Sequence, residues 1–282
     1  MGKAVKDPPS TADGEERDAV KESAEASGES SLLSGMFTSM FLPKGFPDSV
    51  SKDYMAYQFW DTLGGFCAYF RGVLTMIAIL VGVGVGDPDA SPEKAMMIWC
   101  IKDLVGMVVG LACGVPVLTS LFSQSRYLPY FRLLSEIVGG VAASLELYAG
   151  VRPDLYLPLA CVAAVLYQIG GVTGGCTRAA LMRHFARKEN FADCAAKEGN
   201  QDRGVKAVGI AIAYLFLRRG RLSPSLSLGL FTTFTLSHMI ANIMAVSVLE
   251  LKPDDDEKET LPEAAKGGAI KSGKAGKEKK AN

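Results

Sequence analysis

Residues 155–177 constrain this chain more than any other part of it, because these 23 consecutive residues carry no formal charge. A hydrocarbon core of roughly 30 Å needs about 20 apolar residues in a helix, so this stretch is long enough to cross a bilayer. It also contains Gln168 and a glycine-rich run at residues 170–175, which a helix that faces only lipid does not need. We therefore expect a membrane helix against which another part of the protein packs closely.

Further apolar stretches extend this prediction to the whole central part of the chain. Taken as helices, they predict an all-α fold, a polytopic membrane bundle of about six transmembrane helices at 63–86, 96–122, 131–150, 155–182, 203–218 and 224–250. We expect a disordered polar segment at residues 1–35, a helical membrane domain at 36–252, and a disordered tail at 253–282 that is first acidic and then rich in lysine. The lipid bilayer is the first partner that this pattern predicts.

The distribution of charge also predicts an orientation. Six helices place both chain ends on one side, and the short loops of that side carry more Lys and Arg than those of the other side. This excess predicts that both ends face the cytoplasm or its equivalent, in an intracellular membrane. The formal net charge is zero, with 30 basic and 30 acidic residues, which argues against a nucleic-acid partner.

Two alternatives for the architecture stay open at the level of sequence. Residues 63–74 and 173–181 share a glycine pair that leads to an arginine, Arg71 or Arg178, which suggests two three-helix halves of inverted orientation. Glycine-rich membrane helices also resemble one another through composition alone. The charges within or beside the apolar helices leave a second option, a large soluble helical domain attached peripherally to a membrane.

Arg71 and Arg178 are the first candidates for a ligand site, since each lies inside or at the edge of an apolar helix. A charge at the centre of a membrane helix costs roughly 2.5–3.5 kcal/mol on insertion scales, so each arginine needs a partner. They would face an anionic ligand, a carboxylate or a phosphate. Alternatively, each reaches the membrane interface or pairs with an acidic residue of the helices, the candidates being Asp61, Asp103, Glu136 and Glu146.

Polar residues elsewhere complete the candidate site. His238 and Asn242 lie on one face of the last predicted helix, where they could line a pathway or bond a neighbouring helix. The segment 196–201 contributes Lys197, Glu198 and Gln201. If a helix begins in this segment, its free backbone N–H groups could hold a phosphate, although a solvated helix is the simpler interpretation. With Gln168, these residues make up the candidate ligand-binding set. No catalytic triad, phosphate-binding loop or metal-ligand spacing is present, so we expect no enzyme activity, no cofactor and no metal ion.

Several motifs together resemble the Root UVB Sensitive (RUS) family. They begin with Phe-Leu-Pro-Lys-Gly-Phe-Pro at residues 41–47 and Tyr-Gln-Phe-Trp-Asp at 57–61. They continue with Asp-Leu-Val-Gly at 103–106, Thr-Arg-Ala-Ala-Leu at 177–181 and Ala-Lys-Glu-Gly-Asn-Gln at 196–201. The order and approximate spacing agree over residues 41–250. Two departures are the polar tail where many relatives carry a further domain, and Asp202-Arg203 where relatives more often show Glu and an uncharged residue.

The resemblance implies a multi-pass membrane protein that is often plastid-associated in plants and acts in interacting pairs. It links the family to UV-B responses of roots and to homeostasis of the pyridoxal vitamins, without settling a molecular activity. Two functions follow as hypotheses. The chain binds or transports a small metabolite, plausibly an anionic, pyridoxal-type compound, in which case Arg71, Arg178, His238 and Asn242 should converge on one cavity. Alternatively, it is an interaction subunit that pairs with another RUS-family protein, and these residues are satisfied internally.

Overall fold

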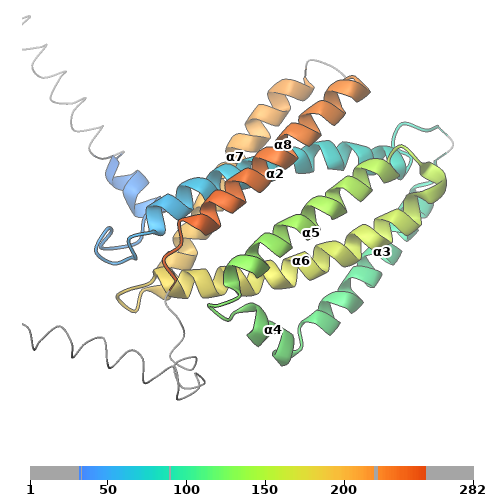
Figure 1. The fold of residues 1–282 in the computed structure, drawn as a ribbon. Helices are drawn as coiled ribbons and strands as arrows, with labels where there is room; N and C mark the ends of the chain where they lie inside the picture. The colour runs from blue at the N-terminus through green and yellow to red at the C-terminus, as the bar shows by residue number, and fades with distance from the viewer. Residues whose placement is uncertain (1–31, 33, 89, 219–221, 252–282) are drawn as a thin grey trace, which may run out of the picture.

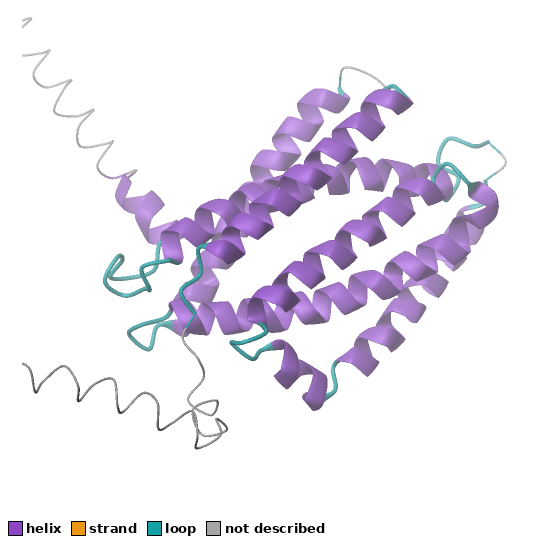
Figure 2. Cartoon of the chain, in the orientation of Figure 1, coloured by secondary structure: helices purple, strands orange, loops and turns teal. Residues whose placement is uncertain are grey.

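The computed structural model describes residues 32, 34–88, 90–218 and 222–251, which fold as an array of helices joined by short loops (Figure 1). The elements are a helix over residues 34–41, α2 (Tyr54–Gly82), α3 (Pro92–Cys113), α4 (Pro116–Phe122), α5 (Leu128–Ala149), a single 3₁₀ turn η1 (Pro153–Leu155), α6 (Tyr156–Phe185), α7 (Phe191–Leu217) and α8 (Pro224–Ser247). Figure 2 shows no strand in the described part of the chain, where the β-structure is one isolated bridge between Val50 and Ala186. The predicted all-α class is confirmed.

Each of the six predicted helices has a counterpart, and three of them differ most from the predicted bounds. The predicted helix 63–86 is α2, which begins at Tyr54 and ends at Gly82. The predicted helix 96–122 is divided into α3 and α4, because Gly114 ends the first and Pro116, which lacks an amide donor, begins the second. The predicted helix 203–218 begins earlier, at Phe191. Ion pairs four residues apart, such as Asp202 with Lys206 at 2.7 Å, stabilise this charged first half of α7.

Four segments are long and apolar enough to cross a membrane: α2, α3, residues Pro153–Phe185 and α8. Of the six predicted spans, four thus correspond to segments that are long and apolar enough to cross a membrane. α5 falls outside this group because it carries Arg132, Glu136 and Glu146, and α7 because its first half is polar. Charged residues within these two helices are costly in a bilayer unless they face the protein interior.

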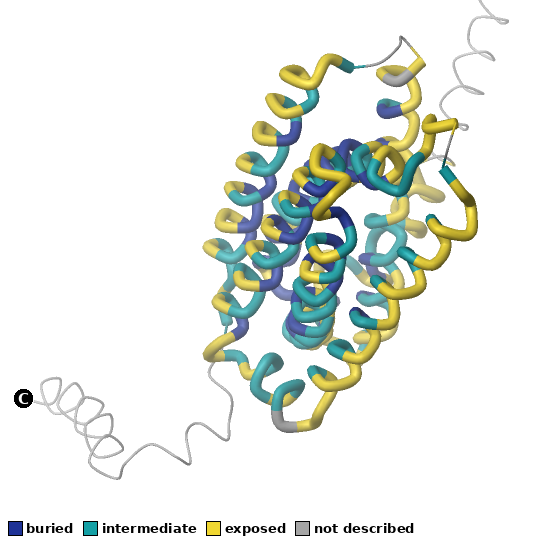
Figure 3. The backbone as a smooth tube through the Cα atoms, turned by 90° about the vertical axis from the view of Figure 1, so that its right-hand side faces the viewer, coloured by how far each residue is buried: buried dark blue, intermediate teal, exposed yellow. Residues whose placement is uncertain are grey.

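The outer surface of the bundle is strongly apolar. Exposed residues lie along the outer faces of the helices and buried ones along the inner faces (Figure 3). On α3, Leu104 is 64% exposed, Met107 61% and Leu111 79%, while Gly106 is the one buried residue of that helix. Apolar faces of this extent are unfavourable in water and suited to hydrocarbon, which favours the bilayer over the soluble alternative.

The helices pack in a crossed pattern between the two halves of the chain. α2 packs against α7 and α8, and α6 packs against α3 and α5, so the first helix of each half contacts the second and third helices of the other half. α2 also packs on α5. α2 and α6 run antiparallel and approach at both ends, where Tyr54 meets Phe185 and Gly82 meets Tyr156.

The two ends of the bundle are closed to different degrees. We call the end that holds both ends of the described chain the terminal end, and the opposite end, with the α2–α3 and α5–α6 connections, the far end (Figure 1). An apolar cluster built around Tyr54, Tyr57, Leu128, Leu181 and Phe185 fills the terminal end. The far end has a smaller cluster around Ile79 and Tyr156 and a third one around Leu74 and Phe231.

Candidate functional site

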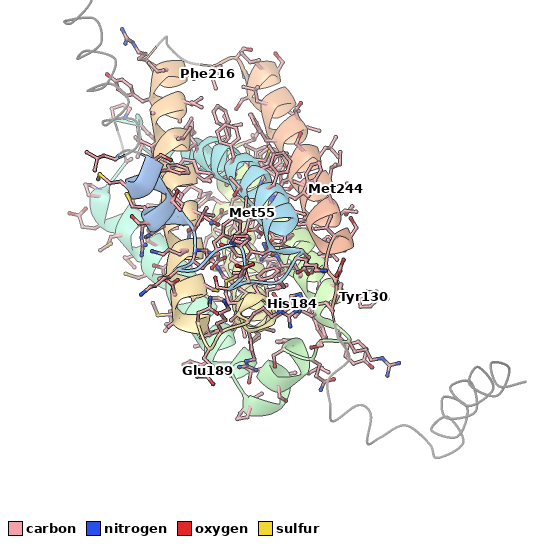
Figure 4. The ribbon with its side chains drawn as sticks, turned by 90° about the vertical axis from the view of Figure 1, so that its left-hand side faces the viewer. Met55, Tyr130, His184, Glu189, Phe216 and Met244 are labelled. Atoms are coloured by element: carbon pink, nitrogen blue, oxygen red, sulfur yellow. The ribbon has the colours of Figure 1, made fainter. Side chains whose placement is uncertain are left out.

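Asp53 connects three parts of the chain at the terminal end. Its carboxylate oxygen Oδ2 accepts the backbone N–H of Glu250 at 2.9 Å and lies 2.8 Å from Nε2 of His184, near the end of α6. Figure 4 looks onto this end, with His184 near its middle. Burial by itself would raise the pKa of Asp53, but hydrogen bonds from these and other donors hold it below the ordinary value. Asp53 therefore joins the start of α2 to the ends of α6 and α8.

The segment 196–201 holds the N-terminal part of the described chain. Gln201 Nε2 donates to the carbonyl of Phe41 at 2.7 Å, Asn200 donates to that of Met40 at 2.9 Å, and Lys197 Nζ donates to that of Ser39. These carbonyls end the helix over residues 34–41, where no further turn of helix can satisfy them. A lysine at a helix C-terminus is also electrostatically favourable. Two of the predicted ligand residues, Lys197 and Gln201, thus form a clamp on this helix.

Arg178 lies apart from the centre of the bundle. Its Nε donates to Oε1 of Glu198, so α6 is linked to α7 by an ion pair with a half-exposed arginine and a buried glutamate. Glu198 was not among the four partners considered from sequence.

The centre of the bundle contains a chain of charged groups from three helices, which we call the central cluster: Asp61 of α2, Arg132 and Glu136 of α5, and His238 of α8. Arg132 lies 2.7 Å from Oδ1 of Asp61 and 3.1 Å from Oε1 of Glu136. Nε2 of His238 lies 2.9 Å from Oε2 of Glu136. His238 is 3% exposed, and its Nδ1 is buried without a hydrogen-bond partner.

Arg71 lies beside this cluster with part of its guanidinium unused. The residue is 7% exposed, and its Nη1 is buried without a hydrogen-bond partner. Glu136 and the Tyr167 hydroxyl lie within its electrostatic range. The same nitrogen faces Gly140 of α5, where a methyl group would lie 3.5 Å from it. A buried arginine that keeps a free donor is poised to bind a further negatively charged group.

The other two predicted polar residues occupy helix contacts. Asn242 donates to the carbonyl of His238 at 2.9 Å and packs on Gly64 of α2. Gln168 packs on Gly106 and Gly110 of α3, in the α3–α6 contact. The structure therefore gathers Arg71, His238 and Asn242 along the α2–α8 region. Gln168 lies instead in the α3–α6 contact, and Glu198, the partner of Arg178, lies within electrostatic range of Asp61 and Arg132.

A second buried ion pair lies further along α5. Nζ of Lys102 is 3.5 Å from Oε1 of Glu146, and Tyr167 hydrogen-bonds to the same carboxylate. Sequence reasoning named Asp61, Glu136 and Glu146 only as partners for arginines and did not single out Arg132 as a site residue. The available signal was the spacing of Arg132 and Glu136, opposite charges four residues apart in a predominantly apolar helix.

A cavity of about 1190 Å³ opens at the far end. The α2–α3 connection, residues 82–87, lines one side of it, and the starts of α3 and α6 line the other. Leu222 lines the cavity and also packs on the Leu74–Phe231 cluster. Arg71 lies three residues before Leu74 on α2, or about 4.5 Å along the helix axis. None of the predicted ligand residues lines this cavity, so the expected convergence on one cavity is not met.

Within the described residues, no group of three or more His, Cys, Asp or Glu side chains is arranged to hold a metal ion. The charged and titratable groups of the centre are two arginines, two carboxylates and one histidine.

Comparison with known proteins identifies relatives over most of the chain. Residues 27–253 match a family model described as a vitamin B6 photo-protection and homoeostasis domain. RUS family member 1 of Dictyostelium discoideum is 36% identical over 216 residues, 76% of this chain and 40% of that protein. Protein root UVB sensitive 3 of Arabidopsis thaliana is 32% identical over 221 residues, 78% of this chain and 50% of that protein.

A third relative, the chloroplastic Protein root UVB sensitive 2 of Arabidopsis thaliana, is 26% identical over 162 residues, 57% of this chain and 36% of that protein. The chain thus spans half or less of the length of these relatives. No solved structure matches it. The match of the family model and the identity to two relatives bear out the motifs recognised in the sequence, and the chain belongs to the Root UVB Sensitive (RUS) family.

Proposed function

We propose that this chain is a non-enzymatic membrane protein that binds a small anionic metabolite of the vitamin B6 class and carries it across an intracellular membrane. The observation that carries this proposal is the buried guanidinium of Arg71, whose Nη1 has no hydrogen-bond partner. Burying a donor without an acceptor is costly, and an anion that binds to this nitrogen supplies the missing acceptor. The family description supplies the class of compound, and the phosphorylated forms of vitamin B6 are anions.

The arrangement of the bundle supports a route for this ligand. Leu222 separates the far-end cavity from the Leu74–Phe231 cluster, and Arg71 precedes Leu74 by about one helical turn on α2. The opposite end is filled by the Tyr54–Phe185 cluster. In each of its two access states, a carrier has a binding site that is open to one side of the membrane and closed to the other.

The crossed packing of the helices supports the same function. If α2, α3 and α5 correspond to α6, α7 and α8, the helix pairs α2–α7 and α2–α8 have counterparts in the pairs α6–α3 and α6–α5. Two halves of inverted orientation produce such a pattern of helix contacts, and inverted halves are a frequent architecture of secondary transporters. The chloroplastic relative makes a plastid membrane one location to examine.

The proposal is tested by binding of pyridoxine 5′-phosphate, which lacks the aldehyde that would react with lysines, to the purified protein in detergent. We expect Arg71→Met to weaken binding about 10- to 100-fold, the effect of losing one charge-assisted contact. Arg183→Met, at an exposed position of α6, is the matched control and should bind as the wild type does. Thermal unfolding of Arg71→Met checks that this variant is folded. Equal binding by wild type and Arg71→Met would reject the site.

The second candidate function is that of an interaction subunit, paired with another RUS-family protein. The contacts of Arg178 and Lys197 favour it, because both side chains bind groups of the chain itself, Glu198 and the carbonyl of Ser39. α3 would then offer the pairing surface, since its outer face is exposed along the whole helix. Wild-type protein that binds no B6 phosphate but elutes with a second RUS-family protein after co-expression would favour this candidate.

A further inference from the structure

The charges around His238 balance only while its ring is neutral. Arg132 and Glu136 face it from α5, and Arg71 faces it from α2, where Asp61 is bound to Arg132. Two guanidinium groups, Arg71 and Arg132, thus stand against two carboxylates, Asp61 and Glu136. Asn242 contributes no charge from α8 itself. A neutral His238 leaves this group of side chains with no net charge.

The hydrogen bonding of His238 leaves room for one further proton. Its Nε2 is 2.9 Å from Glu136, a carboxylate that accepts hydrogen bonds, so we assign the ring N–H to Nε2. Its Nδ1 is then an unprotonated acceptor, buried and without a partner. A proton that arrives at Nδ1 produces an imidazolium whose Nε2–H already points at a carboxylate, the arrangement that stabilises a charged histidine.

A ligand anion would disturb this balance. An anion bound at Arg71 adds negative charge to a region in which the existing charges already cancel, and the surroundings are too poorly solvated to screen it. Of the side chains in the central cluster, His238 is the basic group that is neutral beforehand and has a free acceptor. Protonation of Nδ1 restores one unit of positive charge next to the ligand.

We infer that His238 takes up a proton when an anion binds at Arg71, so that the proposed carrier moves its anion together with a proton. This inference rests on the proposed function and adds the coupling ion to it. The proton comes from solvent and bonds to Nδ1, and Glu136 remains a carboxylate that accepts from Nε2. Release of the anion at the other side of the membrane would release the proton as well.

Calorimetry measures this coupling directly. Binding of pyridoxine 5′-phosphate to the full-length protein is titrated at one pH in two buffers of different ionisation enthalpy, and the difference in heat gives the number of protons taken up. The chain has two histidines, which provide the matched variants His238→Gln and His184→Gln. We expect His184→Gln to take up about one proton more per bound ligand than His238→Gln. Protonation of the phosphate itself contributes equally to both variants and cancels.

The outcomes separate the inference from the function on which it rests. Equal proton uptake in the two variants, with binding retained, would overturn the proton coupling and leave the anion site at Arg71 intact. Absence of binding to the wild type would overturn both. If His238→Gln does not fold, Glu136→Gln serves as the second variant, because it removes the carboxylate that stabilises the imidazolium. Glu136→Gln should also lower proton uptake relative to His184→Gln, and unchanged uptake would count against the inference.

Discussion

Buried polar residues of this chain fall into two kinds that differ in how completely they are hydrogen-bonded. Asp53 receives several donors and is 5% exposed, so it has little capacity left for a ligand. Arg71 and His238 are equally buried but each keeps one nitrogen without a partner. Because burying an unsatisfied polar atom costs free energy, the first kind is suited to stability and the second to binding.

Replacement of Asp53 by asparagine tests the stabilising role. The depressed pKa means that the folded state favours the carboxylate, so its contribution is fully present above the ordinary aspartate pKa of about 3.9 and is lost as pH falls through the lower folded value. We expect Asp53→Asn to lose about 1.5–3 kcal/mol of stability at pH 7. The thermal unfolding temperature in detergent, measured between pH 7.5 and pH 3, should differ between wild type and variant at neutral pH and converge at acidic pH. A difference in unfolding temperature that stays constant over this pH range would contradict the stabilising role of the Asp53 carboxylate.

At the scale of helices, close approach is set by individual glycines. A methyl group at Gly150 would lie 2.6 Å from the backbone oxygen of Ala78, so α5 and α2 could not keep their contact at the far end. We expect Gly150→Ala to destabilise the protein by about 1–3 kcal/mol. Gly139 of the same helix has nothing within 4 Å of the corresponding position, and Gly139→Ala should be neutral or slightly stabilising. Thermal unfolding of the two variants in one detergent makes the comparison, and equal effects would be inconsistent with this contact.

The clamp formed by α7 predicts a local effect. Gln201→Ala removes the hydrogen bond to the Phe41 carbonyl, and we expect faster tryptic cleavage after Lys44 with little change in overall unfolding. Asp202→Ala is the control, because Asp202 contacts the exposed Lys206 of its own helix and not the clamp. Unchanged cleavage in Gln201→Ala would show that the other bonds of the clamp suffice.

The sequence predicted the long helices well because apolar periodicity and Gly or Pro breaks are local signals. It placed the start of α7 too late, because the segment 191–202 is polar and lacks an apolar face, although pairs four residues apart support a helix there. It named Arg71 and His238 as site residues, but not Arg132, which binds both Asp61 and Glu136. Which buried charge meets which is decided by the crossing of helices distant in sequence, such as α5 and α8, and no local pattern encodes that crossing.

At the scale of the whole molecule, the apolar outer surface favours a lipid environment over water for the helical bundle. Leu104 of α3 is 64% exposed, so Leu104→Arg would be nearly harmless in water but would cost about 2.5–3.5 kcal/mol in a bilayer. We expect wild-type protein to remain in membranes during alkaline carbonate extraction and Leu104→Arg to insert less well. Glu93→Arg, at the exposed start of the same helix, is the matched control. Release of the wild type into the soluble fraction would contradict a membrane-embedded fold.

The bond between Asp53 and the backbone of Glu250 has a mechanical consequence. It joins Glu250, after the end of α8, to the residue directly before α2. The first and the last of the long helices are therefore held together at the terminal end. The same carboxylate oxygen contacts His184 near the end of α6, so displacement of Glu250 would disturb three segments of the chain together. Movement of residues 248–251 is thereby coupled to the start of α2 and to the end of α6.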